Sequence, residues 1–260
     1  MFLTRSKLKI NFILLYLLLI FLNSITFKHL FAENIYIGVA SNFLTPMKAL
    51  KENFESINDG KIFISSGSSG SLYSQIINGT QIDIFLSADQ NQPKKNEKTA
   101  KAIKGTRFTY ATGKLVVYTT KKFLFGQSFP QFLTSNKINY IGIGNPEYVP
   151  YGRAAIEVLK SLKVIKTISP KFVLGKSINQ VFLMSFFGNL DLGFVSKADF
   201  LSNNEKGKTW EIPQNLYSPI KQDAILLKNG EKKNNAILFL KFLSSKKTKE
   251  NIEKFGYIVD

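Results

Sequence analysis

The chain has 260 residues, a net charge of +17, no cysteine and a single histidine, His29. Without cysteine it forms no disulfide bond, presents no thiolate nucleophile and offers no thiol for lipid attachment. Its lysines are scattered or in short pairs, without a basic helix or a basic stripe interleaved with aromatic residues. The charge therefore predicts a solvated basic surface and no nucleic-acid partner.

Residues 1–32 have the features of a secretory signal peptide. Basic residues precede an apolar core from Phe12 to Leu22, and a Leu-Phe-Ala sequence ends at Ala32. The alternative is an uncleaved membrane anchor, but the apolar core is short for a membrane span. We expect cleavage after Ala32 and export to the periplasm without a lipid anchor. The remaining 228 of the 260 residues would carry a net charge of +13, because the removed segment holds four basic residues and no acidic one.

The exported chain would contain neither histidine nor cysteine, because His29 lies in the predicted signal peptide. This excludes Ser-His-Asp and Cys-His catalysis and zinc sites with His or Cys ligands. Carboxylate pairs and a Ser-Lys dyad remain open as catalytic groups. We expect a binding protein without a cofactor, and not an enzyme.

Beyond the signal peptide, short β-rich runs alternate with helical patterns. In chain order, strands are expected over residues 33–40, 62–64, 82–86, 114–120, 140–144, 172–174, 192–195 and 224–227. Helices are expected over residues 43–54, 72–78 and 155–162, from residue 177 onward, and over 234–255, where Ile237, Leu240 and Leu243 would form the inner face. This alternation predicts an α/β fold of parallel-rich sheets flanked by helices. Ligands of such folds bind at the carboxyl ends of strands, beside helix N-termini.

The most informative segment is the run of serine and glycine over residues 65–71. It lies between the strand expected to end near Ile64 and a helix whose apolar positions are Leu72 and Ile76. Glycine lets a backbone approach a ligand closely, and the first amides of a helix have no intrahelical acceptor. A helix start with added hydroxyls suits a small oxyanion. The alternative is a flexible linker or a decorated helix cap.

Three other turns have the same form, with a strand, a short polar or glycine turn and a helix start. They lie at residues 40–42, 149–152 and 175–178. The serines at positions 41 and 177 could be helix caps only. Because the carboxyl ends of parallel strands meet at one edge of a sheet, several such turns could converge on one cleft.

Other motifs in the sequence give little evidence of function. The sequence has no phosphate-binding loop, and Gly142 and Gly144 lack the third glycine of a dinucleotide fingerprint. Asp83, Asp89 and Glu147 could form a carboxylate cluster for a cation or for acid–base chemistry, but capping and turn roles explain them as well.

Several of these segments together resemble one family. The motifs are VASNF, SSGSSGSLYSQIINGTQIDIFLSADQ, GNPEYVPYGRAAIEVL and LGFVSKADF, preceded by the signal peptide. They are similar, in order and over nearly all of the mature chain, to the periplasmic molybdate-binding proteins of ABC importers. The resemblance implies the two-lobed flytrap fold of type II periplasmic binding proteins, with two crossing strands as the hinge. It implies lobe one over residues 33–112 plus 222–260 and lobe two over residues 113–221.

The resemblance also implies the ligand contacts, residue by residue. Ser41 and Ser69 match the two serines that bind the oxyanion through hydroxyl and amide. Tyr151, where the family commonly has alanine, and Ile178 match positions that donate backbone amides. Ser196 falls where some members use a tyrosine hydroxyl, and a serine is shorter. No cation ligand is implied, because molybdate itself carries the metal.

The expected ligand is molybdate or tungstate, and the expected partner is the membrane permease of an ABC transporter, with the protein a monomer. Sulfate or another tetrahedral oxyanion is the alternative within the class. An exported enzyme on the same bilobal fold, and a basic protein that binds polyanionic surfaces, are the alternatives outside it. A site built only from donors would reject HPO₄²⁻, whose proton needs an acceptor.

Overall fold

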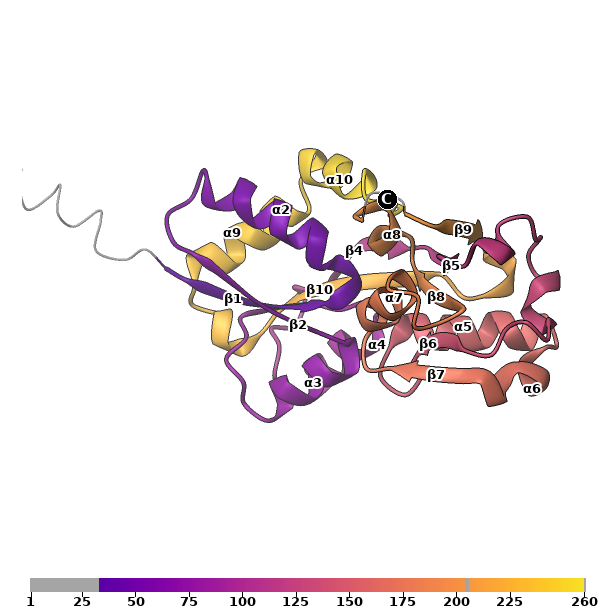
Figure 1. Cartoon of the computed structure of the whole chain (residues 1–260). Coiled ribbons are helices and arrows are strands. Elements are labelled where there is room, and N and C mark those ends of the chain that lie inside the picture. The colour runs from indigo at the N-terminus through magenta and orange to yellow at the C-terminus, as the bar shows by residue number, and fades with distance from the viewer. Residues whose placement is uncertain (1–32, 204–205, 260) are drawn as a thin grey trace, which may run out of the picture.

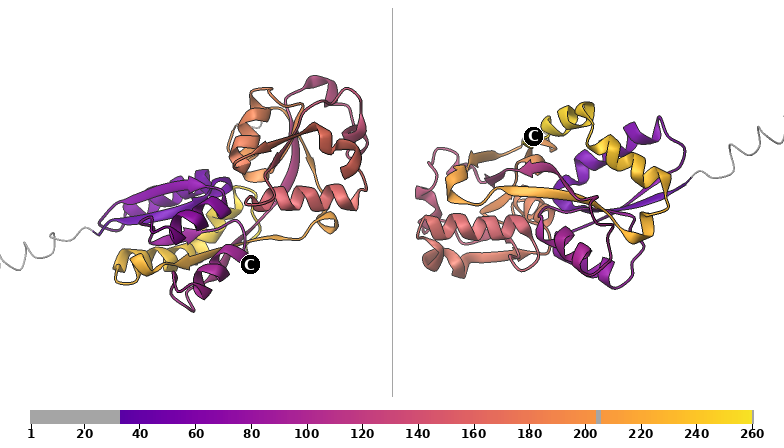
Figure 2. Two further views of the ribbon diagram at one scale, coloured as in Figure 1. Left: turned by 90° about the horizontal axis from the view of Figure 1, so that it is seen from below. Right: turned by 180° about the vertical axis from the view of Figure 1, so that it is seen from behind.

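The computed structural model describes residues 33–203 and 206–259. The predicted signal peptide over residues 1–32 lies outside the described residues. The described residues form two five-stranded sheets, each covered by helices, which lie side by side as two bodies (Figures 1 and 2). No helix in these ranges is both long and apolar enough to cross a membrane.

The first sheet has the strand order β2-β1-β3-β10-β4. Its strands are β1 (Ile35–Ala40), β2 (Ile62–Gly67), β3 (Ile84–Leu86), β4 (Phe108–Gly113) and β10 (Ile220–Leu226). β1 pairs in parallel with β2 and β3, whereas β10 runs antiparallel to β3 and β4. We call this sheet with its helices the first unit.

The second sheet has the strand order β7-β6-β8-β5-β9. Its strands are β5 (Leu115–Thr119), β6 (Ile141–Gly144), β7 (Phe172–Gly175), β8 (Leu192–Ser196) and β9 (Lys208–Glu211). β6 pairs in parallel with β7 and β8, and β5 runs antiparallel to β8 and β9. This sheet with its helices is the second unit. The predicted α/β fold of parallel-rich sheets flanked by helices is confirmed; each sheet is mixed, with a single reversed strand, β10 in the first and β5 in the second.

Helices cover both faces of the first sheet. One face packs against α2 (Leu44–Glu55) and α9 (Asn234–Leu243) through a buried cluster that includes Met47 and Phe239. The other packs against α3 (Ser69–Ile77) through Leu72 and Ile76. Near this second face the chain also forms α4 (Asn91–Lys98), which contacts α3.

The second sheet is covered in the same way. Residues of β5 alternate between its two faces, as the pleat of a strand requires. Leu115 and Val117 belong to the core shared with α5 (Pro150–Ser161), whereas Val116 and Tyr118 belong to the core shared with α7 (Ile178–Phe186). The short helices α6 (Ile165–Ile168) and α8 (Lys197–Leu201) complete this unit.

The chain crosses between the sheets twice, from β4 to β5 at residues 113–115 and from β9 to β10 over residues 211–220. The elements β4, β9 and α4 were not among those expected from the sequence. The helical tail is broken into α9 and α10 (Lys246–Glu253), because Ser245 caps a new helix. The prediction that Ile237 lies on the inner face of α9 is wrong, because Ile237 is 38% exposed while Ala236 and Phe239 are buried.

Candidate functional site

The predicted turns lie at matching ends of paired strands. In the first sheet the last residue of β1, Ala40, pairs with the last residue of β2, Gly67. In the second sheet Gly144 at the end of β6 pairs with Gly175 at the end of β7. Each strand is followed by a helix start, so two helix N-termini from each sheet face the seam between the units.

These helix starts surround a narrow cavity of about 10 Å³, roughly the space that one water molecule needs. It is lined by Ala40, Ser41, Asn42, Gly67, Ser68, Ser69, Ala88, Val149, Pro150, Tyr151 and Ile178. None of these side chains is charged, and residues from both units contribute. The partial positive charge at the helix N-termini is therefore the main electrostatic feature of its walls, and it favours an anion.

Ser69 is the first residue of α3 and is 1% exposed. Its Oγ accepts a hydrogen bond from the Ala88 amide at 2.8 Å. A serine hydroxyl has one proton and two lone pairs. Because the Ala88 contact uses a lone pair, the proton remains available to an acceptor in the cavity. The neighbouring Ser68 is instead the helix cap, and its Oγ accepts from the Ser71 amide.

Ser41 begins the 3-10 helix η1 (Ser41–Phe43), which runs directly into α2. Its side chain has no hydrogen-bond partner among the described residues, although the residue is only 7% exposed. Ser41 lines the cavity, so the proton of its hydroxyl is available to a ligand there.

Tyr151 presents its backbone to the cavity because of the residue before it. α5 begins with Pro150, which has no N–H, so the Tyr151 amide is the first of that helix. At Gly152, two residues after Pro150, an added Cβ would lie 1.9 Å from the Gly144 carbonyl oxygen. Glycine at position 152 therefore brings the start of α5 against the end of β6.

The Tyr151 side chain lies in a buried polar network that joins the units. Its hydroxyl accepts from Gln222 Nε2 at 3.2 Å. Gln222 Oε1 accepts in turn from Asn42 Nδ2 at 2.9 Å and from the Tyr110 hydroxyl at 3.0 Å. Burial raises the pKa of the Tyr151 and Tyr110 hydroxyls well above the ordinary value, so both stay neutral. The large side chain at position 151 is thus accommodated within the seam between the units.

Ile178 is the first residue of α7 and is 2% exposed. The helix is capped by Ser177, whose Oγ accepts from the Gln180 amide at 3.2 Å. The Ile178 amide itself has no acceptor within its helix. Of the five residues implied by the resemblance, the cavity brings together Ser41, Ser69, Tyr151 and Ile178.

Ser196 does not line this cavity. It is the cap of α8, where its Oγ accepts from the Asp199 amide at 3.1 Å and donates to Asp199 Oδ2 at 2.5 Å. Asn179 Nδ2 donates to the other carboxylate oxygen at 3.1 Å. Burial raises the pKa of Asp199 to about 7, and the hydrogen bonds from Ser196 and Asn179 oppose this rise. The Ser196 proton is therefore already committed to a carboxylate.

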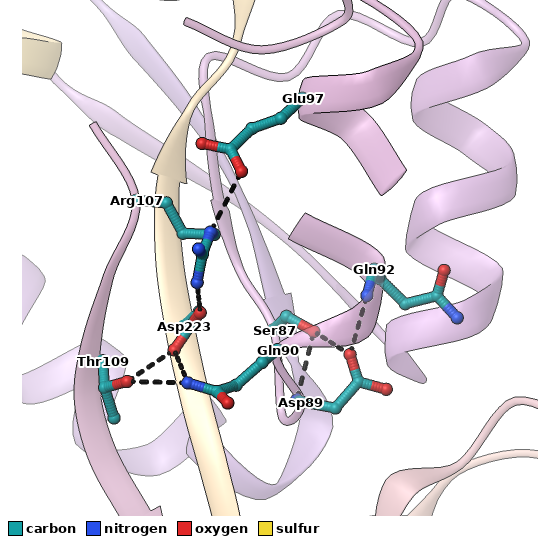
Figure 3. A network of polar contacts seen from close by, with 8 residues as sticks. All are labelled: Ser87, Asp89, Gln90, Gln92, Glu97, Arg107, Thr109 and Asp223. Atoms are coloured by element: carbon teal, nitrogen blue, oxygen red, sulfur yellow. Dashed lines mark hydrogen bonds and ion pairs between the residues drawn. The ribbon is translucent and has the colours of Figure 1, made fainter. Parts of the chain in front are cut away.

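The loop after β3 carries Ala88 to the cavity and is fixed by polar contacts (Figure 3). Ser87 Oγ donates to Asp89 Oδ1 at 3.2 Å, and the Gln92 amide donates to the same oxygen at 3.0 Å. The other carboxylate oxygen of Asp89 forms an ion pair with Arg153 of the second unit. Asp89 thus joins the units and does not contribute to a metal site.

A second set of contacts holds this loop to β10 (Figure 3). Asp223 is fully buried and accepts from Arg107 Nη1 at 2.6 Å, from Thr109 Oγ1 at 2.7 Å and from Gln90 Nε2 at 3.2 Å. The hydrogen bond to Asp223 is the main cause that raises the pKa of Arg107. No group of three or more His, Cys, Asp or Glu in the described ranges could hold a metal ion.

Asn42 and Ala88 were not predicted as site residues. Asn42 lies in the turn at residues 40–42, where the family resemblance implies a role only for its neighbour Ser41. Nothing local marks Ala88, which reaches the cavity only because the loop after β3 packs on Ser69.

Comparison with known proteins gives consistent matches. A sequence model of the family described as "Bacterial extracellular solute-binding protein" matches residues 35–258. The molybdate-binding protein ModA of Rhodobacter capsulatus is 38% identical over 229 residues, covering 88% of this chain and 90% of that protein. ModA of Azotobacter vinelandii is 37% identical, covering 87% and 90%. The solved periplasmic molybdate-binding protein of Azotobacter vinelandii superimposes with a TM-score of 0.83 at 34% identity, over 87% of this chain and all of the other.

Proposed function

This chain belongs to the bacterial extracellular solute-binding protein family, and we propose that it binds molybdate, with tungstate as a close analogue, in the cavity between its two units. It would deliver the anion to the permease of an ABC transporter. One observation carries the proposal: four helix starts, two from each sheet, surround one small cavity without a charged side chain. The relatives named above, both molybdate-binding proteins, supply the identity of the ion.

The donors suit a tetrahedral dianion. The hydroxyls of Ser41 and Ser69 are available as donors, and the first amides of α3, α5 and α7 lie at residues 69, 151 and 178. Hydrogen bonds to an ionised acceptor are worth roughly 1.5–3 kcal/mol each. The cost of desolvating the ion and closing the units must be subtracted from this sum. Four or more such hydrogen bonds still leave enough free energy for a dissociation constant of about micromolar.

The absence of a carboxylate from the cavity wall sets the protonation state of the ligand. Asp89 pairs with Arg153 outside the cavity, and Asp199 is bound by Ser196 and Asn179. HPO₄²⁻ would bring a proton that no carboxylate in the cavity wall accepts, so we expect phosphate to bind weakly. Sulfate has the same charge and shape as molybdate and differs mainly in size, so we expect it to compete for the site more strongly than phosphate does.

Binding of the ion would be coupled to closure of the two units. We propose lobes over residues 33–112 plus 222–260 and residues 113–221, which swing about the two crossings. An ion that contacts both lobes stabilises the closed arrangement, and the permease would recognise that arrangement. The same proposal includes cleavage of the chain after Ala32 and export to the periplasm. There the protein would act as a monomer without a lipid anchor.

A thermal unfolding panel tests the identity of the ion. A ligand that binds only the folded chain raises the unfolding temperature, and the rise grows with the logarithm of the ligand concentration over its dissociation constant. We expect molybdate and tungstate at millimolar concentration to raise it by several degrees, sulfate less, and phosphate not at all. A rise with sulfate that exceeds the rise with molybdate would assign the site to sulfate instead.

A further inference from the structure

The two units touch directly beside the cavity, backbone to backbone. Gly70 is the second residue of α3 in the first unit, and its amide donates to the Tyr148 carbonyl of the second unit at 3.0 Å. The chain neighbours of this pair, Ser69 and Val149, both line the cavity. The contact therefore lies at the rim of the proposed binding site.

This approach leaves no room for a side chain at position 70. A Cβ built on Gly70 would lie 2.3 Å from Tyr148 Cβ and 2.8 Å from Tyr148 Cα. The glycine is not required by its own backbone, because it sits in a helix and has no positive φ angle. Within the first unit alone, alanine would be the better helix former. The reason for glycine at this position lies in the other unit.

A second contact crosses the same seam. Asp89 is held inside the first unit through Oδ1, which accepts from the Gln92 amide at 3.0 Å. Its Oδ2 pairs with Arg153 on α5, the helix that follows Tyr148 and Val149. The start of α5 is thus held to the first unit at two points, one of which tolerates only glycine.

We propose that Gly70 is a positioning residue for ion binding: its missing side chain allows the start of α3 to close on Tyr148, which brings the donors of both units around one ion. The inference rests on the proposed function. It predicts that a single methyl group at position 70 keeps the units apart while leaving each of them folded.

The test compares Gly70→Ala with wild type and with a matched control. Gly126→Ala is suitable, because a Cβ on Gly126 meets nothing within 4 Å and its φ is not positive. We expect Gly70→Ala to weaken molybdate binding by about tenfold or more. We expect it to abolish the fall in radius of gyration on addition of molybdate, measured by small-angle X-ray scattering. Without the ion it should unfold at the wild-type temperature or above, and the control should match wild type throughout.

A rescue variant separates a steric block from other damage. Tyr148→Gly removes the Cβ that comes closest to position 70, whereas Tyr148→Ala keeps it. The molybdate affinity of each double variant is divided by the affinity of its own Tyr148 single variant. On this scale, Gly70→Ala with Tyr148→Gly should bind molybdate more tightly than Gly70→Ala with Tyr148→Ala. Equal affinities of the two double variants on this scale would overturn the steric account.

The outcomes also separate this inference from the function on which it rests. If wild type gives no heat with molybdate or tungstate, the proposed function fails. If wild type binds molybdate and Gly70→Ala binds it within about threefold, the function stands and the inference about Gly70 is overturned.

Discussion

The Ser69 hydroxyl accepts a hydrogen bond from the Ala88 amide at 2.8 Å, across two different turns of the first unit. This bond fixes the oxygen of Ser69 and directs its proton away from Ala88. The hydroxyl is thereby preorganised as a donor before any ion arrives, and little rotamer freedom remains to be lost on binding.

Replacement of Ser69 with alanine should remove this donor and leave the Ala88 amide without its acceptor. We expect molybdate affinity to fall by about tenfold or more, because a charge-assisted hydrogen bond is lost. Titration calorimetry measures the change. Ser74→Ala is the matched control, since Ser74 lies on the same helix and its Oγ donates only to the Gly70 carbonyl. Unchanged affinity in Ser69→Ala would remove its hydroxyl from the site.

Tyr151→Phe should separate the two roles of that residue. The backbone amide is retained, so molybdate affinity should stay within about threefold of wild type. The buried Gln222 Nε2 loses its partner, which should lower the free energy of unfolding by roughly 1–3 kcal/mol. Urea unfolding with and without the ion tests both parts. Tyr140→Phe, at a position 58% exposed, should change neither quantity. A large loss of affinity without a loss of stability would show that the hydroxyl contacts the ion.

Ser196→Ala should affect stability more than binding. The variant loses the cap of α8 and a hydrogen bond to Asp199, which together should cost about 1–2 kcal/mol of unfolding free energy. Its effect on molybdate affinity should be smaller than that of Ser69→Ala. Calorimetry on both variants makes the comparison, and equal losses would place the Ser196 hydroxyl among the ion ligands after all.

The stability of the protein should depend on pH through Asp199. Burial raises the pKa of this carboxyl from 3.8 to about 7, so the folded chain holds a proton that the unfolded chain has released. The stabilisation from this proton is fully present below pH 3.8 and is lost as pH rises toward 7. Asp199→Asn cannot titrate, so the stability difference between wild type and variant should move in the variant's favour between about pH 4 and 7 and then level off. A difference that is constant over this range would contradict the assignment.

Arg153→Gln should shorten the lifetime of the bound ion. Its ion pair with Asp89 joins the two units outside the cavity, so its loss should speed dissociation several-fold with a smaller effect on association. Stopped-flow displacement of molybdate by excess tungstate measures the rate. Lys228→Gln is the control, because Lys228 pairs with Glu231 on the surface of one unit. If both variants release the ion at the wild-type rate, the ion pair has no part in retention.

Much of the site could be expected from the sequence because its donors are local features. Ser41, Ser69 and Ile178 each stand at a strand-to-helix turn, and the register of the parallel pairs Ala40 with Gly67 and Gly144 with Gly175 places those turns at matching strand ends. The turn that holds Tyr151 has the same form, and the family resemblance singled out Tyr151 within it.

What the sequence could not give were contacts between distant segments. Ala88 meets Ser69 only through the loop after β3, and Gln222 meets Tyr151 across 71 residues of chain. The strand β9 and helix α4 were missed because their sequences, KTWE and NQPKKNEK, lack the apolar alternation or helical periodicity that marks a buried face. Ile237 was misplaced because the buried side of α9 is set by its tertiary packing, in which Phe239 contacts Phe54 of α2.

Calorimetric titration of the wild-type protein with molybdate shows whether one oxyanion binds between the two units. We expect a saturable heat with one ion bound per chain, a dissociation constant of about micromolar or below, and competition by tungstate. The absence of any heat with molybdate or tungstate, from folded protein freed of bound ion, would contradict this expectation.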